Sequence, residues 1–160
     1  MKFLMFLRAD IRLFTSLVTL VWIGFLFYLG ATSSTPETPV FPSSDVSSLG
    51  HFGAHLILAI LVFLLAQPKS PLIQHSLRAA AIALGTSLIF GLFIEGIQAS
   101  IEGRYAEVSD LLFNTLGAIT GISMAFVSCR LKVRPSYLSA AVGGAALALL
   151  GLVGLNAALF

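Results

Sequence analysis

The chain has 160 residues, of which 58% are hydrophobic and 10% charged, and its mean hydropathy is +0.99. A water-soluble domain of this size and composition would aggregate, so these values exclude a soluble globular protein and indicate a membrane protein. The net charge of +2 arises from scattered basic residues, which excludes the continuous cationic surface of a nucleic-acid-binding protein. The single cysteine, Cys129, excludes an intrachain disulfide and a cysteine metal site.

Apolar runs long enough to cross about 30 Å of hydrocarbon predict an all-α integral membrane helical bundle of about five transmembrane helices. The second span is short and closes at Gln67-Pro68, whereas the fifth is uncharged throughout. Glu95 lies at the far end of the third span, and Asp110 lies at the start of the fourth. We expect one domain over residues 1–160, with spans at residues 13–31, 51–66, 79–97, 108–127 and 137–160.

The basic residues predict the orientation of the bundle, because Lys and Arg in short loops are retained on the cytoplasmic side. With alternating spans, only Arg104 of the nine basic residues falls outside. We therefore expect a multi-pass protein of the cytoplasmic (inner) cell membrane, with a cytoplasmic N-terminus and an extracytoplasmic C-terminus. The eight basic residues on the inner side are Lys2, Arg8, Arg12, Lys69, Arg78, Arg130, Lys132 and Arg134.

The first span also has features of a cleavable signal peptide, namely basic residues, an apolar run and small residues at positions 31–33. Its apolar run is longer than the roughly 7–15 residues of a signal core, which favours a retained helix. Cleavage would leave the topology of the other spans unchanged.

Polar side chains gather at the outer ends of the second, third and fourth spans. Two histidines open the second span, a glutamate and a glutamine close the third, and an aspartate and an asparagine open the fourth. The loop between the third and fourth spans adds an arginine. We predict that these groups form an outward-facing polar pocket, whose candidate residues are His51, His55, Glu95, Gln98, Arg104, Asp110 and Asn114.

Helical spacing places these groups on shared faces that continue into glycines, because residues three, four, seven and eleven apart lie on one side of a helix. In the fourth span, small residues four apart permit close helix approach, so its polar face should point into the bundle and not toward lipid. The third span presents Gly91, Glu95 and Gln98, and the fourth presents Asp110, Asn114, Gly117 and Gly121.

A carboxylate inside a membrane helix costs about 2.5–3.5 kcal/mol at the centre and less near the interface, and it usually has a partner or a function. The Arg104 guanidinium can bridge Glu95 and Asp110 through forked hydrogen bonds, whereas the two carboxylates alone would repel each other. The predicted pocket can therefore accept an anion.

The motifs in this region resemble those of the VanZ-like family of bacterial membrane proteins. The resemblance lies in Glu95-Gly-Ile-Gln98, then Gly103-Arg104, then Asp110-Leu-Leu-Phe-Asn114-Thr-Leu-Gly117-Ala-Ile-Thr-Gly121, and His51-Phe52 is similar to the family's earlier histidine motif. It implies a role in the bacterial cell envelope, since the family's named member is associated with resistance to the glycopeptide teicoplanin. The chain departs from the family at Ser47-Ser48, where an acidic residue followed by lysine is common.

These features favour a pocket that binds or modifies an envelope lipid, or the headgroup of a lipid-linked saccharide, with the lipid bilayer as the other partner. A non-catalytic alternative is that the polar groups only hold the bundle together. A second alternative is a metal-dependent membrane hydrolase in which His51 and His55 bind Zn²⁺ with Glu95 or Asp110. The sequence assigns no cofactor, oligomeric state or reaction, and no nucleophile is evident. A channel is disfavoured, because most spans have no ionisable residue in their cytoplasmic half.

The topology predicts that a cysteine replacing Glu102 is labelled by a membrane-impermeant thiol reagent added from outside the cell. Labelling of Glu102→Cys only after the cytoplasmic side is opened to the reagent would show that the predicted orientation is wrong.

Overall fold

The computed structural model describes residues 2–32, 44–68, 73–101, 107–131 and 137–146. Four long helices follow one another along the chain: α1 (Lys2–Thr32), α2 (Ser44–Ala66), α3 (Ile73–Ala99) and α4 (Val108–Arg130). A shorter helix, Tyr137–Ala146, follows α4. The described residues contain no strand, so the predicted all-α fold is confirmed.

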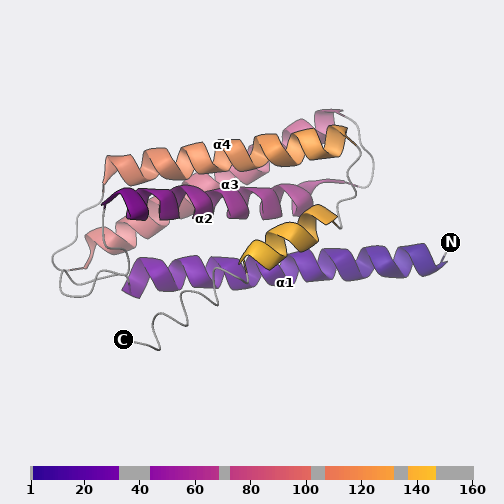
Figure 1. The fold of residues 1–160 in the computed structure, drawn as a ribbon, viewed down its shortest axis with the longest axis horizontal. Helices are drawn as coiled ribbons and strands as arrows, with labels where there is room; N and C mark the ends of the chain where they lie inside the picture. The colour runs from indigo at the N-terminus through magenta and orange to yellow at the C-terminus, as the bar shows by residue number, and fades with distance from the viewer. Residues whose placement is uncertain (1, 33–43, 69–72, 102–106, 132–136, 147–160) are drawn as a thin grey trace.

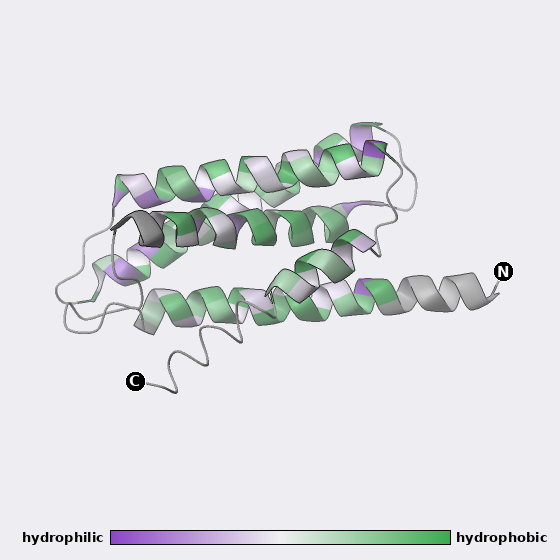
Figure 2. Cartoon of the chain, viewed as in Figure 1, coloured by the Kyte–Doolittle hydropathy of each residue, from purple (hydrophilic) through white to green (hydrophobic). Residues whose placement is uncertain are grey.

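Four of the predicted spans are helices that are long and apolar enough to cross a membrane. The expected fifth span begins as a helix at Tyr137, and its residues 147–160 lie outside the described part of the chain. Helices α1, α2 and α3 begin before the predicted spans, because polar residues outside the hydrocarbon can still continue a helix. Figure 2 shows this pattern, with hydrophilic residues near helix ends and hydrophobic residues along the middles.

Helix α2 lies at the centre of the bundle and contacts α1, α3 and α4. Figure 1 shows α2 and α4 side by side and running in the same direction, with α3 running the opposite way. One end of the bundle therefore carries the start of α2, the end of α3 and the start of α4; we call it the site end. The α2 side chains that belong to the buried hydrophobic core are Ile57, Leu58, Ala59, Ile60, Leu61 and Phe63.

Two glycines of α4 pack directly against the backbone of α2. A Cβ atom at Gly117 would overlap the carbonyl oxygen of Phe52, and one at Gly121 would overlap that of Leu56. Phe52 and Leu56 are one helical turn apart, as are the two glycines, so the contact runs along the helices. The predicted small-residue face thus lets α4 approach α2 more closely than any larger residue would allow.

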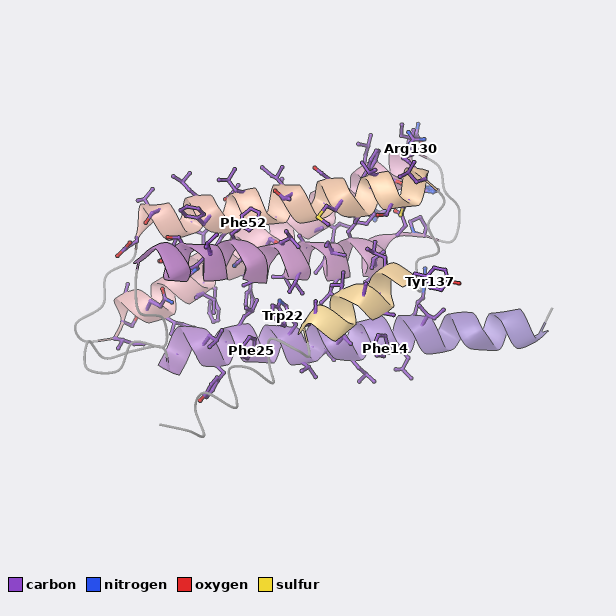
Figure 3. All side chains as sticks on the ribbon, in the orientation of Figure 1. Phe14, Trp22, Phe25, Phe52, Arg130 and Tyr137 are labelled. Carbon is purple, nitrogen blue, oxygen red and sulfur yellow. The ribbon has the colours of Figure 1, made fainter. Side chains whose placement is uncertain are left out.

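Helix α1 is attached to α2 by hydrogen bonds at two depths. The buried Trp22 indole Nε1 donates to the backbone oxygen of Ala54 over 3.1 Å, and Figure 3 shows this side chain pointing from α1 toward α2. Toward the opposite end of the bundle, Arg12 donates to the backbone oxygen of Gln67 over 3.0 Å. This second contact satisfies a carbonyl at the end of α2 that has no partner within the helix.

Large apolar side chains cover the outside of the bundle. Ile89 is 72% exposed, and similar residues occur along α1, α3 and α4. An apolar surface this extensive is stable in lipid, where it contacts acyl chains, and would aggregate in water. The chain is therefore a multi-pass membrane protein. Other such exposed residues are Leu13, Leu17, Leu20, Val21, Leu92, Phe93, Leu112 and Leu116.

Replacing Gly117 with alanine should destabilise the bundle, because the added methyl group meets α2 backbone that cannot rotate away. The expected loss is about 1–3 kcal/mol, as for other overpacked interiors, measured by thermal unfolding in detergent. Gly85→Ala is the matched control, since a Cβ at Gly85 meets nothing within 4 Å. That substitution should leave stability unchanged or raise it by up to about 1 kcal/mol. Equal effects of the two substitutions would contradict the close contact.

Candidate functional site

His51 on α2 contacts two polar residues of α4. Its Nδ1 lies 3.1 Å from Asn114 Oδ1, and its Nε2 lies 3.3 Å from Asp110 Oδ2. The His51 and Asp110 side chains are 17% and 14% exposed, so most of the surface of both side chains is buried. Both ring nitrogens are therefore engaged by one neighbouring helix, and the imidazole is fixed in orientation.

Asp110 occupies the first turn of α4, which begins at Val108 after the N-cap residue Glu107. A carboxylate is favoured there by the partial positive charge of the unsatisfied N–H groups at a helix N-terminus. Asn114 lies one turn further along the same face and is 1% exposed. The one-turn spacing of Asp110 and Asn114 thus places a carboxylate and an amide group beside the same imidazole, that of His51.

Glu95 approaches the same place from the end of α3. It is 6% exposed, and its Oε2 accepts a hydrogen bond of 3.2 Å from the backbone N–H of Glu107. One ligand atom each from His51, Glu95 and Asp110 lies within 4.8 Å of the other two. We call these three residues the His-Glu-Asp cluster. Three helices that are separate in the sequence each contribute one ionisable group to it.

His55 and Gln98 are buried near the cluster but are not part of it. A Cβ atom at Gly91 would lie 3.1 Å from Asn114 Nδ2 and 3.3 Å from His55 Cε1, so this glycine makes room for both side chains. His55 therefore packs one turn deeper, against α3 and α4. The metal-site alternative from the sequence has His51 and His55 binding one Zn²⁺ ion together. In the structure His55 lies against Gly91 instead, and the residues grouped with His51 are Glu95 and Asp110.

Arg104 and Glu102 lie outside the described residues, so the proposed bridge from Arg104 to the two carboxylates stays a prediction. The hydroxyl groups of the nearby serines are used locally: Ser100 Oγ donates to the Gly96 carbonyl, and Ser109 Oγ donates to Glu107 Oε2. Each hydroxyl group donates its hydrogen to an acceptor within four residues along the chain, and not to His51.

Nothing in the residue pattern indicates that the backbone of Glu107 takes part in the site. Its N–H anchors Glu95, and this hydrogen bond ties the end of α3 to the start of α4. A main-chain donor has no residue type, so neither composition nor spacing can reveal it. The contact also positions Asp110, because it fixes the point at which α4 begins.

A comparison with protein-family models matches residues 3–130 to the model described as VanZ/LLP1. The chain belongs to the VanZ/LLP1 family. The match spans α1 to α4 and every candidate site residue, and it ends before the helix Tyr137–Ala146. No curated protein and no solved structure matches the chain. The resemblance drawn from the motifs is thereby confirmed.

A double-mutant cycle should detect the contact between His51 and Asp110. We expect the effect of Asp110→Asn on stability to change by about 0.5–3 kcal/mol when His51→Gln is already present, as for other residues in contact. Thermal and denaturant unfolding in detergent would measure it. The control pair is His51→Gln with Glu107→Gln, whose exposed carboxylate faces Ser109, and these changes should add within about 0.5 kcal/mol. Additivity in the first pair would show that the 3.3 Å contact contributes nothing.

Proposed function

We propose that this VanZ-family bundle binds the headgroup of a bacterial envelope lipid, bearing a phosphate or a sugar, at the site end. One observation carries the proposal. The His-Glu-Asp cluster brings ionisable groups from three membrane helices within 4.8 Å of one another. Ionisable residues inside membrane helices are costly, and those that persist usually serve a ligand, an ion or a proton path.

The surroundings of the cluster suit an amphipathic ligand. Exposed apolar side chains lie within one turn of it: Leu92 precedes Glu95 on α3, and Leu112 follows Asp110 on α4. A lipid lying against the bundle would place its tails along these residues and its headgroup at the level of the cluster. A water-soluble ligand would gain nothing from the apolar residues.

The polar groups themselves match a headgroup. The Asp110 and Glu95 carboxylates are hydrogen-bond acceptors suited to sugar hydroxyls, and Arg104 would supply the charge for a phosphate. A role in the cell envelope and a link to teicoplanin-type resistance, both implied by the VanZ resemblance, fit this ligand class. We propose binding without a modification step, since the described serines beside the cluster, Ser100 and Ser109, donate their hydrogens to neighbouring groups of the chain.

The competing proposal is that these contacts only hold the helices together. His51 joins α2 to α4, and Glu95 joins α3 to the start of α4, so both groups do stabilise the bundle. That role, however, needs only neutral donors and acceptors. Burying two carboxylates within 4.8 Å of a histidine costs more desolvation than burying neutral groups in their place.

Mass spectrometry of lipids that co-purify with the full-length protein tests the proposal. We expect an envelope lipid enriched over the bulk membrane, and an occupancy about tenfold lower in Arg104→Ala and in Asp110→Asn, which corresponds to about 1.4 kcal/mol of binding. Arg130→Ala and Glu107→Gln are the matched controls. Arg130 lies at the opposite end, over the Phe126 ring, and Glu107 is exposed. Unchanged lipid content in all four variants, with stability reduced in Asp110→Asn, would favour the structural alternative.

A further inference from the structure

A cavity of about 250 Å³ lies at the end of the bundle opposite the His-Glu-Asp cluster, where α2 ends and α3 begins (Figure 1). Ala66 and Pro68, at and just after the end of α2, form one wall. The first three turns of α3 form the other, through His75, Arg78 and Ile82. We call this cavity the α2–α3 groove. None of its residues belongs to the cluster, so the groove is separate from the candidate functional site.

The α3 wall of the groove continues along the helix as an exposed apolar face. His75, Arg78 and Ile82 are three and four residues apart, so they share one side of α3, and the same spacing extends to Gly85 and Ile89. Ile82 is 42% and Ile89 72% exposed, and a Cβ atom at Gly85 would meet nothing within 4 Å. We call Ile82, Gly85 and Ile89 the apolar track. A polar groove thus leads into an apolar track that is open at its glycine.

The length of this face matches one leaflet of a membrane. Arg78 and Ile89 are eleven residues apart on one helix, which corresponds to about 16 Å at about 1.5 Å per residue. One half of a hydrocarbon core about 30 Å thick has nearly the same depth. The face therefore suits a single phospholipid, with a polar group at the membrane boundary and an acyl chain beneath it.

The charge of the groove favours an anionic headgroup. Arg78 is exposed, and no carboxylate of the described residues forms a salt bridge with it. Its planar guanidinium can donate two parallel hydrogen bonds to the oxygens of one phosphate. The lining contains no acidic residue, and the half-buried His75 imidazole adds to its polar wall. A zwitterionic headgroup would bring its own amine close to Arg78, whereas an anionic one carries no opposing charge.

The position of the groove favours the same ligand. The basic residues predict that this end of the bundle faces the cytoplasm, where anionic lipids attract basic groups next to membrane spans. Basic pockets between membrane helices on that side are known to bind phospholipid headgroups. A free phosphate ion would gain from Arg78 but nothing from the apolar track, so the two features together select a lipid.

We propose that the α2–α3 groove and the apolar track bind one anionic phospholipid, with its phosphate on Arg78 and an acyl chain along Ile82, Gly85 and Ile89. This second lipid site goes beyond headgroup binding at the site end and does not depend on it. The bound lipid contacts the end of α2 and the start of α3 together, so its binding also stabilises the folded bundle.

Lipid binding to the purified full-length protein in a neutral detergent tests this site. Phosphatidylglycerol, phosphatidylcholine with the same acyl chains, or inorganic phosphate is added alone to delipidated protein. We expect native mass spectrometry to show one tightly bound phosphatidylglycerol per chain, and thermal unfolding to shift upward with this lipid. Phosphatidylcholine should bind about tenfold more weakly, and Arg78→Ala should weaken phosphatidylglycerol binding about tenfold, as for the loss of one hydrogen-bonded charge pair. Phosphate alone should leave the unfolding temperature unchanged.

Arg130→Ala is the matched control, because Arg130 is a basic residue at the same end that lies over the Phe126 ring and outside the groove. Its loss should leave phosphatidylglycerol binding unchanged. Asp110→Asn, at the site end, should also keep this lipid, which separates the two proposals. Loss of the site-end ligand with phosphatidylglycerol retained affects the headgroup function alone.

Three outcomes would overturn the second lipid site. The first is equal affinity of the wild-type chain for phosphatidylglycerol and phosphatidylcholine, which indicates ordinary lipid contact. The second is unchanged phosphatidylglycerol binding in Arg78→Ala, which places the lipid elsewhere. The third is stabilisation by inorganic phosphate equal to that by phosphatidylglycerol, which shows an anion site that makes no use of the apolar track.

Discussion

The close contact between α4 and α2 determines the geometry of the site. Gly117 and Gly121 meet the backbone oxygens of Phe52 and Leu56, and no side chain separates the two helices there. Small residues at such positions let two helices approach each other more closely than larger residues would. Because α2 and α4 run in the same direction, the turns before the glycines bring Asp110 to His51 at 3.3 Å.

The central position of α2 explains why the second half of this helix is apolar. Between His55 and Gln67 the helix is apolar and largely buried against α1, α3 and α4. A polar side chain of α2 in that stretch would need a partner on α1, α3 or α4. The Trp22 indole of α1 does approach α2, but it donates to the α2 backbone. The polar side chains of α2 therefore lie in the half of the helix nearer the site end.

The sequence was sufficient to predict four spans, the level of the polar groups and the glycine face of α4. Composition identifies the residues that lie in lipid. The helical period identifies which residues share one side of a helix. The period does not fix how deep a side chain lies relative to another helix. His51 and His55 share a face by spacing, yet His51 meets Asp110 whereas His55 packs at Gly91. The anchoring of Glu95 by a backbone N–H was equally beyond sequence reasoning, since every residue but proline carries one.

The two ends of the bundle show what separates a structural polar contact from a candidate site. At the end opposite the cluster, Arg12 donates to the Gln67 carbonyl, and the Gln67 amide donates to Ser76 over 2.8 Å. One exposed cation and three neutral groups are enough there to join α1, α2 and α3. At the site end the helices are joined instead through two carboxylates and a histidine, whose burial costs more than the burial of neutral groups. These ionisable groups are the feature on which the proposed headgroup binding rests, and the exposed apolar residues beside them are where the tails of such a lipid would lie.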